Sequence, residues 1–315
     1  MAHCFVSRRL PGPALDRLTA EHEVEIWPER LPPTYEQLRE HVADTEGLLS
    51  LLTDRVDADL IAASPRLEVI SNYAVGYDNV DLEAASARGI PVGHTPDVLT
   101  DATADMTFAL LLAAARKLPD AIAAAREGDW VTWEPGEHLG HSVNGQTLGI
   151  IGFGRIGRAV ARRAEGFQMR VISAGSKDSE TTLEQLLEQS DYVSVHCPLT
   201  PATRHLIDGA ALQRMKPTAI LINTARGPIV DQAALADALR AGRIAGAALD
   251  VTDPEPLPHT DPLYGAPNVI VTPHIGSATR AARERMTELA VENLLAGLAG
   301  EPLRHQANVI GSGPA

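Results

Sequence analysis

A short apolar run followed by three closely spaced glycines constrains the fold of this chain more than any other feature. Residues 147–164 read TLGIIGFGRIGRAVARRA, and Gly152, Gly154 and Gly157 have the spacing G-x-G-x-x-G between a strand-like and a helix-like segment. In that context the pattern predicts a dinucleotide site, because a helix N-terminus attracts phosphates. Gly152 would permit the tight turn, Gly154 would let the backbone approach a pyrophosphate, and Gly157 would let the helix pack closely on its strand. An ordinary glycine-rich turn is the alternative interpretation.

The end of the next apolar run indicates which dinucleotide the site would prefer. A site for NAD usually has Asp or Glu there, about 20 residues after the glycines, to accept hydrogen bonds from the ribose 2′-hydroxyl. This run ends instead in AGSK (174–177). Ser176 can donate a hydrogen bond to a 2′-phosphate and Lys177 can place a positive charge beside it, so we expect NADP rather than NAD. In the alternative interpretation Lys177 is a solvated loop residue and Asp178 binds the ribose of NAD.

Apolar runs alternate with helix-like segments along most of the chain, which predicts parallel sheets. With 315 residues, 44% of them apolar, the chain is long enough for two domains. Runs at 47–52 and 67–70 predict a sheet in the first domain. Residues 100–126 read as a helix that Pro119 breaks or kinks, and 278–298 read as a last helix that could pack on the first domain. The remaining runs fit a six-stranded doubly wound sheet and lie at 148–151, 171–172, 192–195, 219–222, 245–251 and 269–271.

Composition argues against several classes of partner. The formal net charge of −14 disfavours nucleic acid and acidic lipid, although a few placed groups can still bind a small anion. No run approaches eighteen apolar residues and the N-terminus lacks the pattern of a secretory signal, so we expect a cytoplasmic protein without a membrane segment. Cys4 and Cys197 have no C-x-x-C partner, which indicates neither a disulfide framework nor a zinc site. His138 and His141 have no third ligand nearby in the sequence, so we expect no metal.

Three reactive side chains directly follow three of the predicted strands. Arg226 lies in NTARG (223–227), Glu255 in DVTDPEP (250–256) and His274 in TPHIGS (272–277). Loops at the carboxyl ends of parallel strands can converge on one ligand site. An arginine can pair with a carboxylate and polarise a carbonyl, and a histidine hydrogen-bonded to a buried glutamate is a usable acid near neutral pH, while a nicotinamide supplies hydride. Taken singly, each residue has a plainer interpretation: a surface arginine, a solvated glutamate and a core histidine.

Seven stretches form a set that is highly specific for one family. They are SNYAVGYDNVD (71–81), RGIPVGHTPDVLTDATAD (88–105), the glycine loop, VHCPLTPATRHLI (195–207), NTARGPIVD (223–231), GAALDVTDPEPLP (246–258) and TPHIGSAT (272–279). With them the chain resembles, nearly end to end, the D-2-hydroxyacid dehydrogenases, and among these the glyoxylate and hydroxypyruvate reductases. The resemblance implies two doubly wound, Rossmann-like α/β domains with an active-site cleft between them. Residues 1–98 and 281–315 would form the substrate domain and residues 99–280 the dinucleotide-binding domain, through which two subunits would associate as a homodimer.

The resemblance also implies roles for individual residues. Arg226 would bind the carboxylate and ketone of the substrate, His274 would donate or accept the proton, and Glu255 would orient His274. Backbone amides of the loop containing Val75 and Gly76 would bind the substrate carboxylate. In addition to the glycines, cofactor contacts would fall on Arg155, Ile156, Cys197, Pro198, Thr203, Thr224, Ala225, Asp250 and Gly276.

The sequence therefore predicts an NAD(P)-dependent oxidoreductase that reduces a small 2-oxo acid, glyoxylate or hydroxypyruvate, to the D-2-hydroxy acid. Hydride would come from NADPH and the proton from His274. A dehydrogenase for another small acid or oxyanion, such as phosphite, is the alternative among enzymes, because related chains share the same loops. A nucleotide-sensing corepressor that keeps the fold and the triad is the alternative of a different class. Many similar reductases have a tryptophan shortly after the position of Trp133, where this chain has GEH (136–138), so the preferred substrate size stays open.

Overall fold

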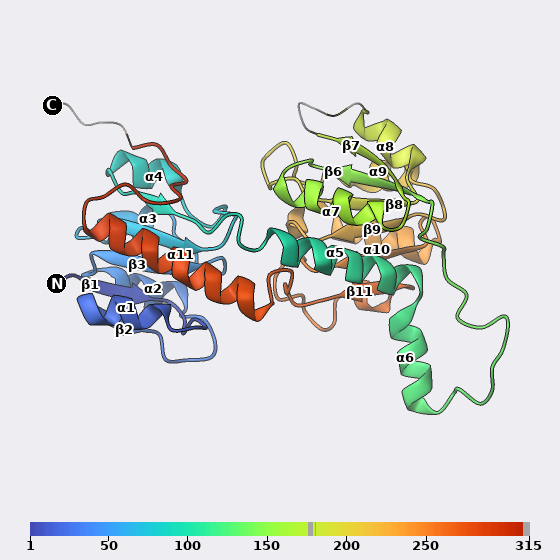
Figure 1. Ribbon diagram of the computed structural model, residues 1–315, viewed down its shortest axis with the longest axis horizontal. Coiled ribbons are helices and arrows are strands. Elements are labelled where there is room, and N and C mark those ends of the chain that lie inside the picture. Colours follow the sequence, from blue (N-terminus) through green and yellow to red (C-terminus); the bar gives the residue numbers. More distant parts are fainter. Residues whose placement is uncertain (176–178, 180, 311–315) are drawn as a thin grey trace. The chain divides into compact units, whose positions relative to one another are not determined.

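The computed structural model describes residues 1–175, 179 and 181–310, which form two compact units (Figure 1). The first unit consists of Met1–Leu99 and the C-terminal segment from Ala278 onward, and the second of Thr100–Ser277. Each unit contains one wholly parallel sheet with helices on both faces, so the predicted fold class of two doubly wound α/β domains is confirmed. Within the described residues, no helix is long and apolar enough to cross a lipid bilayer.

The first unit is built on a five-stranded sheet with the order β2-β1-β3-β4-β5. Apolar residues of the three helices between Tyr35 and Ala87 pack on one face of the sheet, against Phe5, Leu48 and Ile70. The strands are β1 (His3–Val6), β2 (Glu23–Ile26), β3 (Gly47–Leu51), β4 (Val69–Tyr73) and β5 (Val92–Gly93), and the helices are α1 (Ala14–Glu21), α2 (Tyr35–Val42), α3 (Ala58–Ala62), α4 (Leu82–Ala87) and α11 (Arg280–Leu298).

The last helix, α11, lies against β3 and β4 of the first unit. Two hydrogen bonds tie it to β4: the Ser71 hydroxyl donates to the carbonyl of Ala290 at 2.8 Å, and the Tyr73 hydroxyl donates to the carbonyl of Arg283 at 2.8 Å. The expectation that this helix packs on the first domain is therefore met, although the whole second unit separates it from β4 along the chain.

The second unit contains a six-stranded sheet with the order β11-β10-β9-β8-β6-β7. Alternate residues of each strand face opposite sides, so Ile150 and Ile222 join the core beneath α5 and α7, while Ile151 and Leu221 join the core beneath α8, α9 and α10. The strands are β6 (Thr147–Ile151), β7 (Arg170–Ala174), β8 (Tyr192–Val195), β9 (Ile220–Asn223), β10 (Gly246–Leu249) and β11 (Val269–Val271). The helices are α5 (Thr100–Ala115), α6 (Leu118–Glu127), α7 (Arg155–Glu165), α8 (Leu183–Gln189), α9 (Gly209–Arg214) and α10 (Gln232–Arg240), with short 3₁₀ turns η1 (Gly227–Ile229) and η2 (Pro262–Gly265).

The order of this sheet places a switch point between β6 and β8. The chain passes from β6 to β7 on one side of β6 and then to β8 on its other side. In doubly wound sheets, ligands bind at such a point, at the carboxyl ends of the two strands that flank it. The glycine loop follows β6 at this position.

The predicted helix over 100–126 is broken, but the break lies before Pro119 rather than at it. Lys117 has a left-handed backbone with φ of +50° and separates α5 from α6. Pro119 then occupies the first turn of α6, where the missing N–H costs no hydrogen bond.

Candidate active site

The glycine loop turns from β6 into α7 beside the end of β8. Gly152 has φ of +89°, and a Cβ there would lie 2.5 Å from the backbone nitrogen of Cys197. A Cβ on Gly157 would collide with the carbonyl oxygen of Gly152. Close packing inside the chain therefore requires both glycines.

Gly154 is a glycine for a different reason. A Cβ on Gly154 would meet no atom of the described chain within 4 Å, so the space beside it belongs to no protein group that the structure describes. Gly154 is also the N-cap of α7 and has no side chain to satisfy the N–H groups of the first turn, where Arg155 and Ile156 lie. Open space next to these N–H groups fits the pyrophosphate of a dinucleotide.

This contrast predicts different effects for two matched substitutions. We expect Gly154→Ala to leave the free energy of unfolding unchanged but to weaken dinucleotide binding about tenfold or more, because the new methyl group would occupy the space the pyrophosphate needs. Gly152→Ala should destabilise the fold itself by about 1–3 kcal/mol, because alanine tolerates that backbone poorly and contacts Cys197. Thermal unfolding of the ligand-free protein and fluorescence titration with NADPH and NADH measure the two effects. Equal loss of stability in both variants, or unchanged affinity in Gly154→Ala, would contradict this account.

Other predicted cofactor residues lie along the same edge of the sheet. Cys197 and Pro198 lie in the loop that follows β8, and the Thr203 hydroxyl donates a hydrogen bond to the carbonyl of Pro198 at 2.7 Å, which closes that loop. Thr224 follows β9 and is buried, with its hydroxyl oxygen 3.0 Å from the hydroxyl oxygen of Thr107 on α5. The structure thus brings these residues to the carboxyl ends of adjacent strands, next to the glycine loop.

The residues that would distinguish NADP from NAD are not among those described. Strand β7 ends at Ala174, whereas Ser176, Lys177 and the alternative Asp178 lie outside the described residues. The preference for NADP therefore stays a prediction from the sequence.

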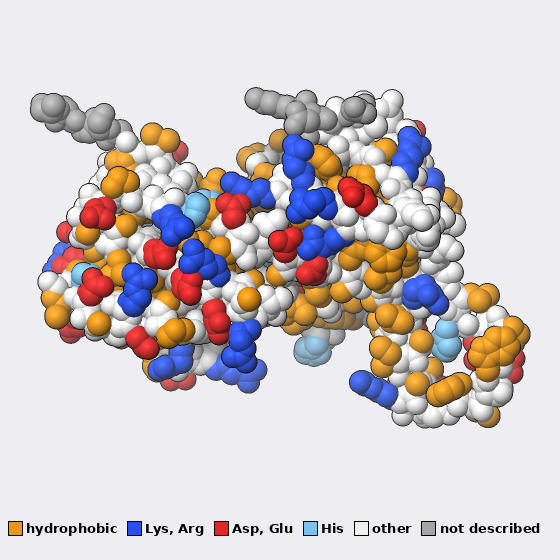
Figure 2. Space-filling view, viewed as in Figure 1, with side chains coloured by type: hydrophobic (Ala, Val, Ile, Leu, Met, Phe, Trp, Pro, Cys, Tyr) orange, Lys and Arg blue, Asp and Glu red, His pale blue; other side chains and the backbone are white. Residues whose placement is uncertain are grey.

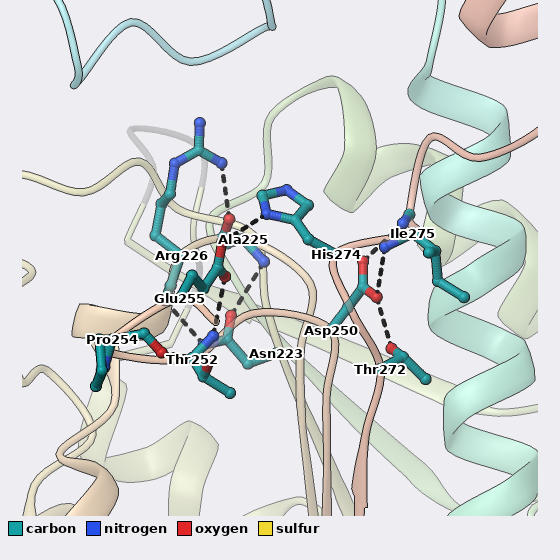
Figure 3. Close-up of polar contacts among 11 residues, drawn as sticks. Asn223, Ala225, Arg226, Asp250, Thr252, Pro254, Glu255, Thr272, His274 and Ile275 are labelled. Atoms are coloured by element: carbon teal, nitrogen blue, oxygen red, sulfur yellow. Dashed lines mark hydrogen bonds and ion pairs between the residues drawn. The ribbon is translucent and has the colours of Figure 1, made fainter. Parts of the chain in front are cut away.

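Arg226, Glu255 and His274 lie together at the ends of three neighbouring strands, β9, β10 and β11 (Figure 3). The Nδ1 atom of His274 is 3.0 Å from Oε2 of Glu255. Because an ionised carboxylate only accepts hydrogen bonds, Nδ1 must carry the proton, which leaves Nε2 for a ligand. The backbone N–H of Thr252 donates to the second oxygen of Glu255 at 3.0 Å, so both oxygens of this carboxylate have donors.

The surroundings of Glu255 favour its ionised form. Partial burial acts to raise the pKa of the Glu255 carboxyl, but the hydrogen bond from His274, the charge of His274, the Thr252 N–H and the charge of Arg226 outweigh burial and hold that pKa below its usual value. The Glu255 side chain is only partly buried, with 32% of its surface exposed. Its role in holding the imidazole depends on these contacts rather than on burial.

Asn223 shapes the loop that carries Arg226. The Asn223 side-chain amide donates to the carbonyl of Arg226 at 2.9 Å, and its oxygen accepts the N–H of Ala225 at 3.0 Å. A Cβ on Gly227 would collide with the carbonyl of Thr252, so this loop packs directly on the loop that leads to Glu255. The buried Asn at the end of an apolar strand is the sequence signal for this turn, because Asn side chains readily close backbone turns.

Asp250 shapes the turn that carries His274, which has a left-handed backbone with φ of +54°. The Asp250 carboxylate accepts three hydrogen bonds, from the Thr272 hydroxyl at 2.5 Å and from the N–H groups of Ile275 at 2.8 Å and Gly276 at 2.6 Å (Figure 3). Its carbonyl accepts the His274 N–H at 2.9 Å. The sequence did not indicate this role, since the resemblance assigned Asp250 only to the cofactor.

Val75 and Gly76 belong to the first unit, in the loop that follows β4, and both are half-buried. The two candidate metal ligands belong to the second unit, where His138 is exposed and His141 half-buried. Among the residues that the structure describes, no three His, Cys, Asp or Glu side chains lie close enough to hold a metal ion.

Comparison with known proteins assigns the chain to a family. The model of the "D-isomer specific 2-hydroxyacid dehydrogenase, NAD binding domain" family matches residues 108–276. A glyoxylate reductase of Korarchaeum cryptofilum (strain OPF8) is 49% identical over 308 residues, which cover 94% of this chain and 93% of that protein. The chain belongs to the D-2-hydroxyacid dehydrogenase family. The prediction of this family is thereby confirmed, and the second unit is its nicotinamide-dinucleotide-binding domain.

Solved structures of other proteins superpose on nearly the whole chain. A crystal structure of a Thermus thermophilus protein has 50% sequence identity and a TM-score of 0.92, and covers 97% of this chain and 99% of that one. An NADPH-dependent glyoxylate/hydroxypyruvate reductase from Sinorhizobium meliloti, in complex with NADP and malonate, has 34% identity and a TM-score of 0.83, and covers 97% of this chain and 96% of that one.

Proposed function

We propose that this protein is an NAD(P)H-dependent reductase that converts glyoxylate or hydroxypyruvate to the corresponding hydroxy acid, of D configuration where that carbon is chiral. The observation that carries the proposal is the hydrogen bond between His274 Nδ1 and Glu255, with Arg226 beside them at the strand ends. The relatives named glyoxylate reductase support the choice of substrate class. A cytoplasmic location, which the sequence pattern favours, is part of the same proposal.

The bound nicotinamide supplies the hydride, and the chain's own groups do the rest of the chemistry. His274 carries a proton on Nε2 and donates it to the oxygen of the substrate carbonyl as negative charge develops there. Glu255 holds the imidazole by its Nδ1–H and so fixes the orientation of the ring. The Arg226 guanidinium pairs with the substrate carboxylate and polarises the carbonyl, and the N–H groups of Val75 and Gly76 also bind the carboxylate.

The same proposal assigns the cofactor contacts. The N–H groups at the start of α7 and the open space beside Gly154 would hold the pyrophosphate. Ser176 and Lys177 would bind a 2′-phosphate, so we expect NADPH to be preferred over NADH. The remaining contacts would come from residues at the carboxyl edge of the sheet: Gly152, Arg155, Ile156, Gly157, Cys197, Pro198, Thr203, Thr224, Ala225, Asp250 and Gly276.

Initial rates of the purified protein test this function. Reduction of glyoxylate, hydroxypyruvate and pyruvate should be compared with oxidation of D-glycerate and phosphite, using NADPH and NADH, or their oxidised forms, at equal concentration. We expect fast reduction of glyoxylate or hydroxypyruvate and a higher rate with NADPH. Turnover of phosphite alone would instead favour the oxyanion dehydrogenase. Dinucleotide binding without any turnover, together with dinucleotide-dependent protein partners, would favour the corepressor.

A homodimer formed through the cofactor domains is also part of the proposal. Helix α6 buries none of its residues within the unit, and the loop after it carries Trp130 and Trp133 with 72% and 79% of their surface exposed. Figure 2 shows the apolar side chains gathered on this segment, an amount of exposed apolar surface that is typical of a protein contact. Light scattering should give the mass of two chains, whereas the mass of one chain would contradict the dimer.

A further inference from the structure

The loop after β4 is held in place by its carbonyl groups. The carbonyl of Ala74 accepts the backbone N–H of Thr95 at 2.8 Å, and the carbonyl of Val75 is 2.9 Å from Nδ1 of His94. In the part of the chain that the structure describes, no group accepts a hydrogen bond from the N–H of Val75 or the N–H of Gly76. The loop thus offers two half-buried donors while its carbonyls are engaged.

The two carbonyl contacts also determine where these donors point. The peptide bonds of this loop are trans, and in a trans peptide the carbonyl of one residue points opposite to the N–H of the next. Since the carbonyls of Ala74 and Val75 point to Thr95 and His94, the N–H groups of Val75 and Gly76 both point away from that segment. Two successive N–H groups on one side of a turn form a small binding site for an anionic group.

The side chain of His94 holds the peptide that joins Val75 to Gly76, by its contact with the Val75 carbonyl. A carbonyl oxygen only accepts hydrogen bonds, so Nδ1 of His94 must be the donor, in its neutral form with the proton on Nδ1 or as imidazolium. The Thr95 contact comes from the backbone and persists whatever side chain is present. The direction of the Gly76 N–H therefore depends on the imidazole, whereas that of the Val75 N–H does not.

His94 is itself fixed by the C-terminal part of the chain. Its N–H donates to the carbonyl of His305 at 3.1 Å, and its carbonyl accepts the side-chain amide of Asn293 at 3.0 Å. The oxygen of the same Asn293 side chain accepts the N–H of His305 at 3.2 Å. A Cβ on Gly93 would lie 2.7 Å from Asn293, so glycine at that position allows this close approach to α11. The ring of Tyr77 packs edge-on against the imidazole at 5.4 Å between centroids.

We propose that His94 is a positioning residue for the carboxylate of the 2-oxo acid, because it holds the Val75 carbonyl and thereby aims the Gly76 N–H at that carboxylate. This rests on the proposed function, in which the amides of Val75 and Gly76 bind the substrate. A peptide whose carbonyl accepts a hydrogen bond is also a stronger donor at its N–H, so the imidazole strengthens the contact that it orients. His94 contacts neither the carbonyl that is reduced nor the hydride, and it acts on binding of the acid rather than on the chemical step.

Two substitutions of similar size separate this role from a structural one. His94→Leu removes the donor, whereas His94→Asn keeps one, since its Nδ2 lies close to the place of the imidazole Nδ1. We expect the KM of the reduced acid and the inhibition constant of oxalate to rise about tenfold in His94→Leu, as for the weakening of one hydrogen bond to a charged group. The KM of NADPH and kcat should change by less than about threefold. His94→Asn should restore values near those of the wild type.

A neighbouring histidine provides the control. His305→Leu removes the ring that lies 6.4 Å from the His94 ring but neither of the two carbonyl contacts, so the KM of the acid should not change. Unchanged KM in His94→Leu, or equal increases in the Leu and Asn variants, would overturn the role of His94. If thermal unfolding shows that His94→Leu does not fold, His94→Ala is the substitute variant, and we expect the same increase in the KM of the acid. If the wild type reduces no 2-oxo acid, the proposed function fails and this proposal with it, whereas an active wild type with an unaffected Leu variant overturns His94 alone.

Discussion

Replacement of His274 by alanine is expected to lower kcat by about 10²- to 10⁴-fold, the range for loss of a positioned general acid. Nδ1 of this histidine is bound to Glu255, so Nε2 is its free position for giving a proton to the developing alkoxide. The dissociation constant of NADPH should change by less than about threefold, because the glycine loop belongs to other strands of the sheet. Stopped-flow or steady-state reduction of the preferred acid, together with NADPH titration, measures both quantities.

Two further variants test why His274 is effective. Glu255→Gln keeps the shape of this partner of His274 but removes its negative charge. It should give a smaller loss of kcat than His274→Ala, because an uncharged amide holds the imidazole less well than a carboxylate does. His259→Ala changes an exposed histidine on the same loop as Glu255 and should leave kcat unchanged. Full turnover in His274→Ala would remove this residue from the mechanism.

The second large effect is expected for Arg226→Lys, although the positive charge is kept. A guanidinium presents parallel N–H donors that can grip a carboxylate and still reach its neighbouring carbonyl, whereas an ammonium is a point charge on a flexible chain. Arg226 is also oriented by its hydrogen bond to the carbonyl of Ala225 at 2.8 Å, which a lysine would not reproduce in the same geometry. We expect kcat/KM to fall by about 10²-fold, the cost of misplacing a group that orients the substrate.

Arg240→Lys is the matched control for this substitution. Arg240 lies on α10 and pairs with Asp237 at the surface, where exchange of one cation for another should leave both kcat and KM unchanged. Thermal unfolding of both variants separates loss of substrate contacts from loss of fold. If kcat and KM of Arg226→Lys both stayed near wild type, Arg226 would have no part in binding the acid.

Patterns among residues close in the sequence were sufficient to predict the strands and the glycine turn that surround the site. The period of the apolar residues predicted all six strands of the second unit, because a strand buried on both faces requires a nearly continuous apolar run. The glycine spacing predicted the turn into α7, since positive φ and close packing permit no other residue at Gly152 and Gly157. The family resemblance named Arg226, Glu255 and His274, but no pattern in the sequence indicated that Glu255 is both partly exposed and hydrogen-bonded to His274.

What the sequence determined by itself is therefore the type and position of the strands of the second unit and of the glycine turn between them, because strand periods and glycine turns depend on near neighbours in the chain. Only the tertiary structure decided that β9, β10 and β11 are adjacent, that Asp250 holds the turn of His274, and that His94 holds the carbonyl of Val75. These contacts join residues that are far apart along the chain. Their formation depends on strand order and on which buried polar groups must find partners, and no local pattern encodes either property.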